Sequence, residues 1–293
     1  MATMASDMQT YGLPVDAGEV FGQGSQEPLE ARSTRAGEGL AVTVSEPLPL
    51  HGVRSVRDLG GYPFTDAQGD RGYTVKGVFL RAGSLFFLTR SDAQLLEAYG
   101  VTRIIDLRSP FELRLLKDPV CRGRYPGVDY VSVPMMDQIN SRGISGQVPD
   151  RMSDVYCGIL DDDAASIREV FLALDDEGCV LFHCRAGKDR TGVIAMLLLK
   201  LVGVDDATVV ADYAVSDRYA GRTWNLQRIG LRIIARRPVG ALFKSAPEEM
   251  ERTLSHLNRE YGSARAYLEG AAEVPSAVLD RIVERFTGRS ATV

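Results

Sequence analysis

The sequence predicts an α/β fold in which a central, mostly parallel sheet is flanked by helices. Short apolar runs alternate along the chain with segments of helical periodicity, which indicates crossover connections between parallel strands. Two of the runs are continuously apolar, as expected of strands covered on both faces. A chain of 293 residues that is 45% hydrophobic can also bury a full-sized core.

The predicted elements begin at about residue 47. Residues 91–100 predict a helix that starts at Ser91 as N-cap and closes at Gly100, and the apolar stretch from Thr191 to about Val202 predicts a helix buried almost all round. Strands are expected at 77–83, 101–108, 128–135 and 178–184. Ligands on parallel sheets bind beyond the carboxyl ends of the strands. This rule selects the loops after Arg81, Asp106, Val133 and Cys184.

The domain organisation follows from composition. Residues 1–46 carry seven acids and two bases among scattered Gly, Pro and Ser, which predicts a disordered acidic extension. Residues 47–290 are expected to form one domain, helical over about 205–262. Within it, residues 218–237 hold six arginines and no acid, with apolar residues at helical spacing. This basic helix is either a solvated face or a lid over the site, and a lid would favour polyanionic substrates or an anionic membrane surface.

Charge and cysteine usage exclude several classes of protein. A net charge of -5 argues against general nucleic-acid binding. Four cysteines without metal-ligand spacing fit a reducing compartment, and with three histidines they make a zinc site unexpected. The N-terminus shows no basic start and no apolar core of a signal peptide, so a cytoplasmic protein is expected, with leaderless secretion left open. The oligomeric state is left open as well.

The stretch 181–194, "LFHCRAGKDRTGVI", places a cysteine between a strand and a buried helix. The free N–H groups and the dipole of that helix suit an anion and lower the pKa of a thiol beside them, so Cys184 is predicted to be a thiolate. Arg190 can hold two phosphoryl oxygens with its planar fork. An activated thiolate, backbone donors and a guanidinium together indicate phosphoryl transfer through a covalent intermediate.

The residues of this loop also bear on three other functions. A nucleotide-binding P-loop is excluded because no second glycine lies five residues before Gly187, and because Asp189 follows Lys188. A phosphate-binding pseudoenzyme is disfavoured because Cys184, Asp189 and Arg190 are all present. A rhodanese-type sulfurtransferase also uses a loop cysteine, but the frame of His183, Cys184, Arg190, Thr191 and Gly192 favours phosphate.

The motif "HCRAGKDRTG" resembles the loop of bacterial tyrosine and phosphoinositide phosphatases with H-C-x-x-G-K-D-R-T-G sequences, within the cysteine-dependent phosphatases. Residues 55–62, 79–85, 101–112 and 261–268 resemble the other segments that recur among proteins of that group, so the resemblance covers about 50–288. It implies one α/β domain, a phospho-cysteine intermediate and neither metal nor cofactor. The expected substrate is a phosphotyrosine protein, with phosphoinositide activity as an extension. There are two alternatives. The first is a phosphatase of small metabolites or nucleotides, and the second is a phosphate-binding pseudophosphatase.

The general acid is the point at which the sequence departs from eukaryotic-type tyrosine phosphatases. Their Trp-Pro-Asp loop is missing, since Trp224 is followed by Asn and Leu. Asp189 is preferred over Asp106 because a proton donor must reach the leaving oxygen. The alternative for Asp106 is a strand-end residue that pairs with Arg81 or Arg108.

The remaining loop residues, Arg185, Ala186, Gly187, Lys188 and Thr191, are expected to bind the substrate. Arg185 and Lys188 are placed at the loop rim, where Lys188 either contacts a second phosphate or balances Asp189. Thr191 is expected to hydrogen-bond the thiolate or cap the helix. His183 should lie on the opposite face of the strand from the nucleophile and order the loop. Cys179 is either a small buried hydrophobe or the partner of Cys184 in a reversible disulfide.

Overall fold

A five-stranded sheet forms the centre of the computed structural model, which describes residues 44–53, 55–125, 127–136, 151–219 and 245–289. Its order is β1 (Arg57–Asp58), β4 (Phe79–Ala82), β7 (Cys179–His183), β5 (Val101–Asp106) and β6 (Asp129–Ser132). Strands β4, β7, β5 and β6 are parallel, and β1 is antiparallel to β4 at one edge. The predicted mostly parallel sheet is confirmed. A separate hairpin pairs β2 (Pro63–Thr65) with β3 (Arg71–Tyr73).

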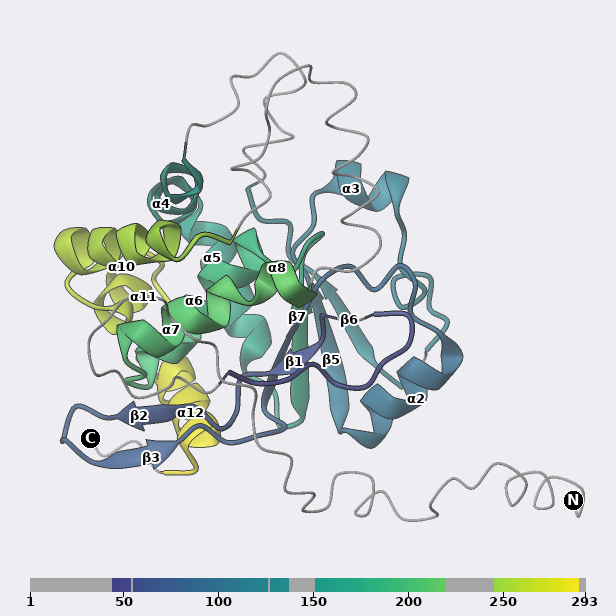
Figure 1. The fold of residues 1–293 in the computed structure, drawn as a ribbon, viewed down its shortest axis with the longest axis horizontal. Helices are drawn as coiled ribbons and strands as arrows, with labels where there is room; N and C mark the ends of the chain where they lie inside the picture. Colours follow the sequence, from purple (N-terminus) through teal and green to yellow (C-terminus); the bar gives the residue numbers. More distant parts are fainter. Residues whose placement is uncertain (1–43, 54, 126, 137–150, 220–244, 290–293) are drawn as a thin grey trace, which may run out of the picture.

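Helices cover the sheet on both sides (Figure 1). On the side of α2 (Arg90–Ala98), a small apolar cluster includes Leu80, Leu96 and Leu181. The larger cluster lies on the other face and takes in residues from most of the helices. These helices are α4 (Met152–Asp162), α5 (Ala164–Leu174), α6 (Asp189–Leu201), α7 (Asp206–Ala214), α10 (Pro247–Tyr261), α11 (Ala264–Gly270) and α12 (Ser276–Thr287).

Side chains of β7 alternate between the two clusters. Val180 and Phe182 belong to the larger cluster, whereas Cys179 and Leu181 belong to the smaller one. All five residues of β7 are buried, which explains why this run carries no polar alternation. Strand β7 therefore delivers its carboxyl end, and Cys184 after it, into the middle of the protein.

Two helix starts differ from the prediction. Helix α2 begins at Arg90 and is capped by Thr89, not Ser91, because the Thr89 hydroxyl accepts from the Asp92 N–H while the Asp92 carboxylate accepts from the Thr89 N–H. Helix α6 begins at Asp189, two residues before Thr191. A short helix that the sequence analysis did not predict, α3 (Pro110–Leu115), follows β5.

The predicted domain limits are only partly covered by the described residues. Residues 1–43 and 220–244 lie outside them, so most of the acidic extension and of the basic segment is not described. Val44 is buried and Ser45 Oγ donates to the Gly60 carbonyl, so the packed body starts before residue 47. Helices α7, α8 (Ser216–Tyr219) and α10 lie within the range 205–262. Among the described helices, none has the length and apolar character that a membrane span needs.

Candidate active site

The loop 184–190 connects β7 to α6 at the carboxyl edge of the sheet. Every residue of α6 from Arg190 to Leu199 is buried, as the apolar sequence predicted. The helix N-terminus is therefore held inside the protein and faces the loop. Asp189 in the first turn places a negative charge where the helix dipole favours one.

Two carbonyl groups of the loop accept hydrogen bonds from β4 and the residues that follow it. Arg81 Nη2 donates to the Gly187 carbonyl at 2.9 Å, and the Ser84 N–H donates to the Arg185 carbonyl at 3.1 Å. Because N–H and C=O of one planar trans peptide point in opposite directions, these bonds turn the corresponding N–H groups away from β4, as an anion site requires. Gly187 has φ +71°, and a Cβ there would lie 2.6 Å from the Ala82 carbonyl group. Only glycine fits this position.

A buried network of ion pairs contacts the loop through Arg81. Asp212 on α7 pairs with both Arg81 and Arg57, and the Arg57 Nε to Asp212 Oδ1 distance is 3.1 Å. Burial alone would raise the pKa of Asp212, but the two guanidiniums outweigh it and hold that pKa below its usual value. Through Arg81, α7 is thus connected to the loop carbonyl at Gly187.

Arg190 is held by Glu112, a residue that the sequence analysis did not single out. Its Nη1 and Nη2 donate to the two Glu112 carboxylate oxygens at 2.7 and 2.9 Å, and Nη1 also donates to the Leu107 carbonyl at 3.1 Å. Glu112 Oε2 accepts from the Ser109 N–H at 2.9 Å in the capping box of α3. Burial tends to raise the pKa of Glu112, yet Arg190 keeps it below its usual value. The guanidinium plane is therefore fixed before any ligand arrives.

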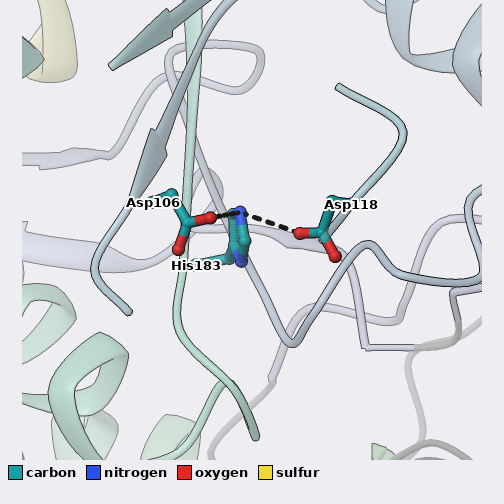
Figure 2. A group of neighbouring side chains, drawn as sticks. All are labelled: Asp106, Asp118 and His183. Atoms are coloured by element: carbon teal, nitrogen blue, oxygen red, sulfur yellow. Dashed lines mark ion pairs between the residues drawn. The ribbon is translucent and has the colours of Figure 1, made fainter. Parts of the chain in front are cut away.

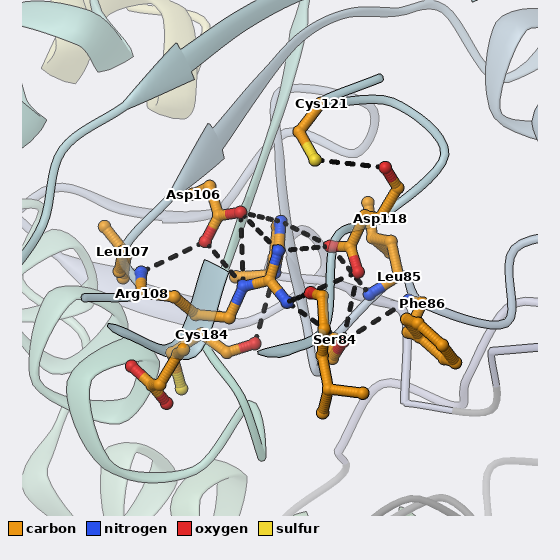
Figure 3. A network of polar contacts seen from close by, with 12 residues as sticks. Ser84, Leu85, Phe86, Asp106, Leu107, Arg108, Asp118, Cys121 and Cys184 are labelled. Atoms are coloured by element: carbon orange, nitrogen blue, oxygen red, sulfur yellow. Dashed lines mark hydrogen bonds and ion pairs between the residues drawn. The ribbon is translucent and has the colours of Figure 1, made fainter. Parts of the chain in front are cut away.

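Behind the nucleophile lies a second buried group, made of Asp106, Arg108, Asp118 and His183 and called here the strand-end cluster. Arg108 Nη2 lies 2.6 Å from Asp106 Oδ2 and 2.8 Å from Asp118 Oδ2 (Figure 3). Figure 2 shows His183 between the two aspartates, with Nε2 at 3.7 and 3.6 Å. His183 Nδ1 lies 3.1 Å from the Cys184 carbonyl oxygen, so the cluster contacts the backbone of the nucleophile.

The three acceptor side chains of the strand-end cluster lie close enough to hold a metal ion. The Arg108 guanidinium, however, already bridges both carboxylates as a cation, with further bonds to Ser84 Oγ and the Leu116 carbonyl. The charge of the two aspartates is balanced by this arginine. The arrangement thus fits an internal salt bridge better than a metal centre.

Asp106 pairs with Arg108, one of the two partners that the sequence analysis allowed it. The side chain is fully buried and also accepts from Tyr130 Oη at 2.9 Å. Burial works to raise its pKa, but His183 and Arg108 overcome this and lower it to about 2. A carboxylate so strongly paired is ionised at neutral pH and poorly suited to donate a proton.

Asp189 has a different environment. Its side chain is 18% exposed, and its Oδ1 accepts from Tyr156 Oη at 2.6 Å and lies 3.4 Å from Lys188 Nζ. Lys188 itself is only 2% exposed, so its expected position at the loop rim is wrong. Its contact with Asp189 agrees with the alternative that it balances this charge. Arg185 and Ala186 are half-buried.

The structure also bears on two expectations about single residues: that Thr191 caps α6 and that Cys179 could form a disulfide with Cys184. Thr191 lies inside the first turn of α6 and does not cap it, and its buried hydroxyl has no hydrogen-bond partner among the described residues. Cys179 and Cys184 are five residues apart at opposite ends of β7, or roughly 16 Å at the usual strand rise. A disulfide requires Cα atoms within about 7 Å, so the predicted alternative of a Cys179–Cys184 bridge is wrong for the folded protein. Cys179 is a buried apolar residue.

Glu112 and Tyr156 were missed for the same reason. Each meets its partner across a long sequence separation, 78 residues for Glu112 with Arg190 and 33 for Tyr156 with Asp189. The Ser-Pro-x-Glu pattern at 109–112 could have predicted the start of a helix, because serine and glutamate at that spacing form a capping box. Nothing local indicated which cation Glu112 would meet.

Three proteins with phosphatase names match parts of this chain. A tyrosine-protein phosphatase of Nostoc commune is 37% identical over 145 residues, which is 48% of this chain and 49% of that protein, so the chain spans about half the length of this relative. A Cupriavidus necator protein is 27% identical over 239 residues, 78% of this chain and 84% of its own. The triple specificity protein phosphatase PtpB of Mycobacterium tuberculosis is 28% identical over 196 residues, 56% of this chain and 70% of PtpB.

A family model covers most of the chain. The model of the tyrosine phosphatase family matches residues 48–288, which include β1, the loop 184–190 and α12. This range agrees with the 50–288 expected from the recurring segments. The chain belongs to the tyrosine phosphatase family.

Proposed function

We propose that the protein hydrolyses phosphate monoesters through a phospho-cysteine intermediate on Cys184. One observation carries the proposal. The same loop holds Cys184, next to the N-terminus of a buried helix, and Arg190, whose guanidinium is fixed by a bidentate contact with Glu112. Preorganised donors of this kind stabilise the charge of a phosphoryl group in transfer. Cys184, Asp189 and Arg190 together also argue against a pseudophosphatase.

In the first half-reaction, Cys184 Sγ attacks phosphorus. The S–P bond forms while the ester P–O bond breaks, and the leaving oxygen takes a proton from the Asp189 carboxyl group. The loop N–H groups and the Arg190 guanidinium hold the equatorial oxygens. Thr191, whose buried hydroxyl has no partner among the described residues, is well suited to stabilise the sulfur when the phosphoryl group leaves.

In the second half-reaction, water attacks the phosphorus of the phospho-cysteine. The water gives a proton to the Asp189 carboxylate, the S–P bond breaks, and its electron pair returns to sulfur as inorganic phosphate is released. Asp189 thus serves as acid and then as base. Partial exposure of its side chain supports this role, whereas Asp106 is fully buried and paired with Arg108.

The favoured substrate class is a phosphotyrosine protein. Two relatives carry the names tyrosine-protein phosphatase and triple specificity protein phosphatase. The contact between Lys188 and Asp189 favours a role in balancing that charge over contact with a second phosphate, and so weakens the case for polyphosphorylated substrates such as phosphoinositides. Small phosphorylated metabolites remain the alternative substrate class, and a panel of phosphopeptides, phosphoinositides, inositol phosphates and nucleotides at matched concentrations separates them.

The covalent mechanism is tested by Cys184→Ser. A serine hydroxyl is not ionised near neutral pH, so turnover of an aryl phosphate should fall below about one part in a hundred of the wild-type rate while the protein stays folded. Cys157→Ser, a change at a half-buried thiol of α4, is the matched control and should retain activity. Rapid quenching should trap a phosphorylated protein only where Cys184 is present. Turnover in Cys184→Ser above that limit would exclude the mechanism.

The acid is tested by comparing Asp189→Asn with Asp106→Asn. Loss of the acid should slow alkyl phosphates by about 100-fold to 10,000-fold and activated aryl phosphates far less, because a good leaving group needs little protonation. We expect this dependence for Asp189→Asn only. The reverse pattern would assign the acid to Asp106.

A further inference from the structure

Two buried tyrosines from outside the loop are connected to Asp189, Tyr156 directly and Tyr213 through Tyr156. Tyr156 comes from α4 and Tyr213 from α7, on the two helices that flank the start of α6. Their exposed fractions are 0% and 1%, and their rings meet edge to face with centroids 5.8 Å apart. Gly192 permits the close approach of α7, because a Cβ there would lie 3.3 Å from the Tyr213 ring.

The hydroxyl groups form a chain that ends on one oxygen of Asp189. Tyr156 Oη donates to Asp189 Oδ1 at 2.6 Å and lies 2.7 Å from Tyr213 Oη. Since the single proton of Tyr156 is used towards Asp189, Tyr213 must be the donor to Tyr156. Burial raises the pKa of both phenols well above its usual value, so both remain O–H donors at any working pH.

Both described partners of Asp189 contact the same carboxylate oxygen. Lys188 Nζ, like Tyr156, lies against Oδ1, and Oδ2 accepts no hydrogen bond from any residue that the structure describes. An oxygen that already accepts from an O–H group and lies beside an ammonium group is the less favourable place for a proton. The proton of the acid form is therefore directed to Oδ2.

We propose that Tyr156, supported by Tyr213, is a positioning residue for the reaction: it fixes the Asp189 carboxyl group and reserves Oδ2 as the oxygen that gives and takes the proton. This inference rests on the proposed function, with Asp189 as acid and base. Without Tyr156 the carboxyl group can rotate, and the proton is no longer directed to one of its two oxygens.

The test is Tyr156→Phe, with Tyr267→Phe as the matched control. Tyr267 is also fully buried and donates to the Leu160 carbonyl of α4 at 2.9 Å, so both variants remove one hydroxyl bonded in the same layer of helices. For Tyr156→Phe we expect kcat for an alkyl phosphate to fall about 10-fold, while an activated aryl phosphate changes by less than about 2-fold. KM should stay near its original value for both substrates. Tyr267→Phe should lower thermal stability without this dependence on the leaving group.

Two further variants separate positioning from a general structural effect. In Asp189→Asn/Tyr156→Phe, the second change should cause no additional loss, because the group that Tyr156 positions is already disabled. Tyr213→Phe, which leaves the Tyr156 contact in place, should show the same leaving-group dependence at a smaller size.

The results that overturn the inference are distinct from those that overturn the function. Equal losses on alkyl and aryl substrates in Tyr156→Phe, or a full additional loss in the double variant, would leave Tyr156 with a structural role only. If Asp189→Asn shows no leaving-group dependence, the assignment of the acid fails and this inference fails with it. Neither outcome affects the covalent mechanism, which stands or falls with Cys184→Ser.

Discussion

Two aspartates near the nucleophile, Asp106 at the end of β5 and Asp189 at the start of α6, differ in burial and in the charges around them. In the strand-end cluster, Asp106 is sealed from solvent, bound to Arg108 and flanked by His183. On the helical side, Asp189 keeps part of its surface exposed and contacts one ammonium group and one phenol, both through Oδ1. The difference separates two uses of a carboxylate. One holds a strand end in place, and the other keeps an oxygen available for proton transfer.

The largest expected effect comes from breaking the strand-end cluster with Arg108→Met. This change leaves the buried Asp106 and Asp118 carboxylates beside each other without the cation that now bridges them. We expect the free energy of unfolding to fall by about 3–5 kcal/mol, measured by urea denaturation. Arg281→Met removes an arginine from an exposed pair with Asp175 and is the control, with a much smaller change expected. Similar losses in the two variants would contradict a structural role for the cluster.

Glu112→Gln should produce the next largest effect, this time on activity. Glutamine keeps one acceptor for Arg190 but loses the charge and the bidentate geometry. We expect kcat/KM to fall by about 100-fold to the same extent for alkyl and aryl phosphates, because Arg190 acts on the phosphoryl group and not on the leaving oxygen. A loss confined to poor leaving groups would instead place Glu112 in the proton-transfer step.

The pH dependence of stability sharpens the comparison further. The pKa of Asp106 is lowered to about 2 in the folded protein, below the usual 3.8. A lowered carboxyl pKa contributes stability that is complete above pH 4 and is lost as the pH falls through 2, here about 2 kcal/mol. Denaturation of the wild type and of Asp106→Asn between pH 5 and pH 2 measures it, and the variant should lack this part of the acid sensitivity.

Asp118 provides the internal control for that experiment. Burial raises the pKa of Asp118, although Arg108 and His183 oppose the effect. A raised carboxyl pKa has the opposite sign, since its contribution is greatest below the unfolded pKa and is lost as the pH rises. Asp118→Asn should therefore leave the loss of stability between pH 4 and pH 2 in place. Its disappearance in this variant would mean that Asp118, not Asp106, carries the acid sensitivity.

The smallest expected effect belongs to Lys188→Ala. Because Lys188 is buried beside Asp189, its loss should reduce kcat/KM at most about 10-fold, and equally for a phosphoinositide and an aryl phosphate. The measurement is kcat/KM on both substrates under the same conditions. A loss ten times greater for the phosphoinositide would restore the interpretation that this loop recognises a second phosphate.

Local patterns were enough to predict the frame of the fold. The runs that became β4 and β7 were recognisable because strands buried on both faces leave no polar alternation, and α6 because it is apolar on every side. Helix starts were less certain, since Thr89 and Ser91 are both good caps and only the reciprocal bond with Asp92 selects Thr89.

The candidate site was predictable where its chemistry lies within the ten residues of the motif. Cys184 and Arg190 are read directly from it, but the position of a side chain relative to the loop is not. Lys188 follows a glycine with positive φ and is buried beside Asp189, which no charge pattern indicates. Glu112 and Tyr156 depend on how α3 and α4 pack against the loop, and that packing is a property of the assembled fold.

The burial of β7 and α6 on either side of the loop has a consequence for how the protein loses its site. Segments enclosed in a core open only when the whole domain opens, so the hydrogen-bonded backbone amides of β7 and of the buried part of α6 should exchange with solvent through global unfolding alone. Fraying of outer elements would leave the loop geometry intact. Partially opened molecules would therefore keep the complete loop, and proteases acting on exposed segments would meet the nucleophile last.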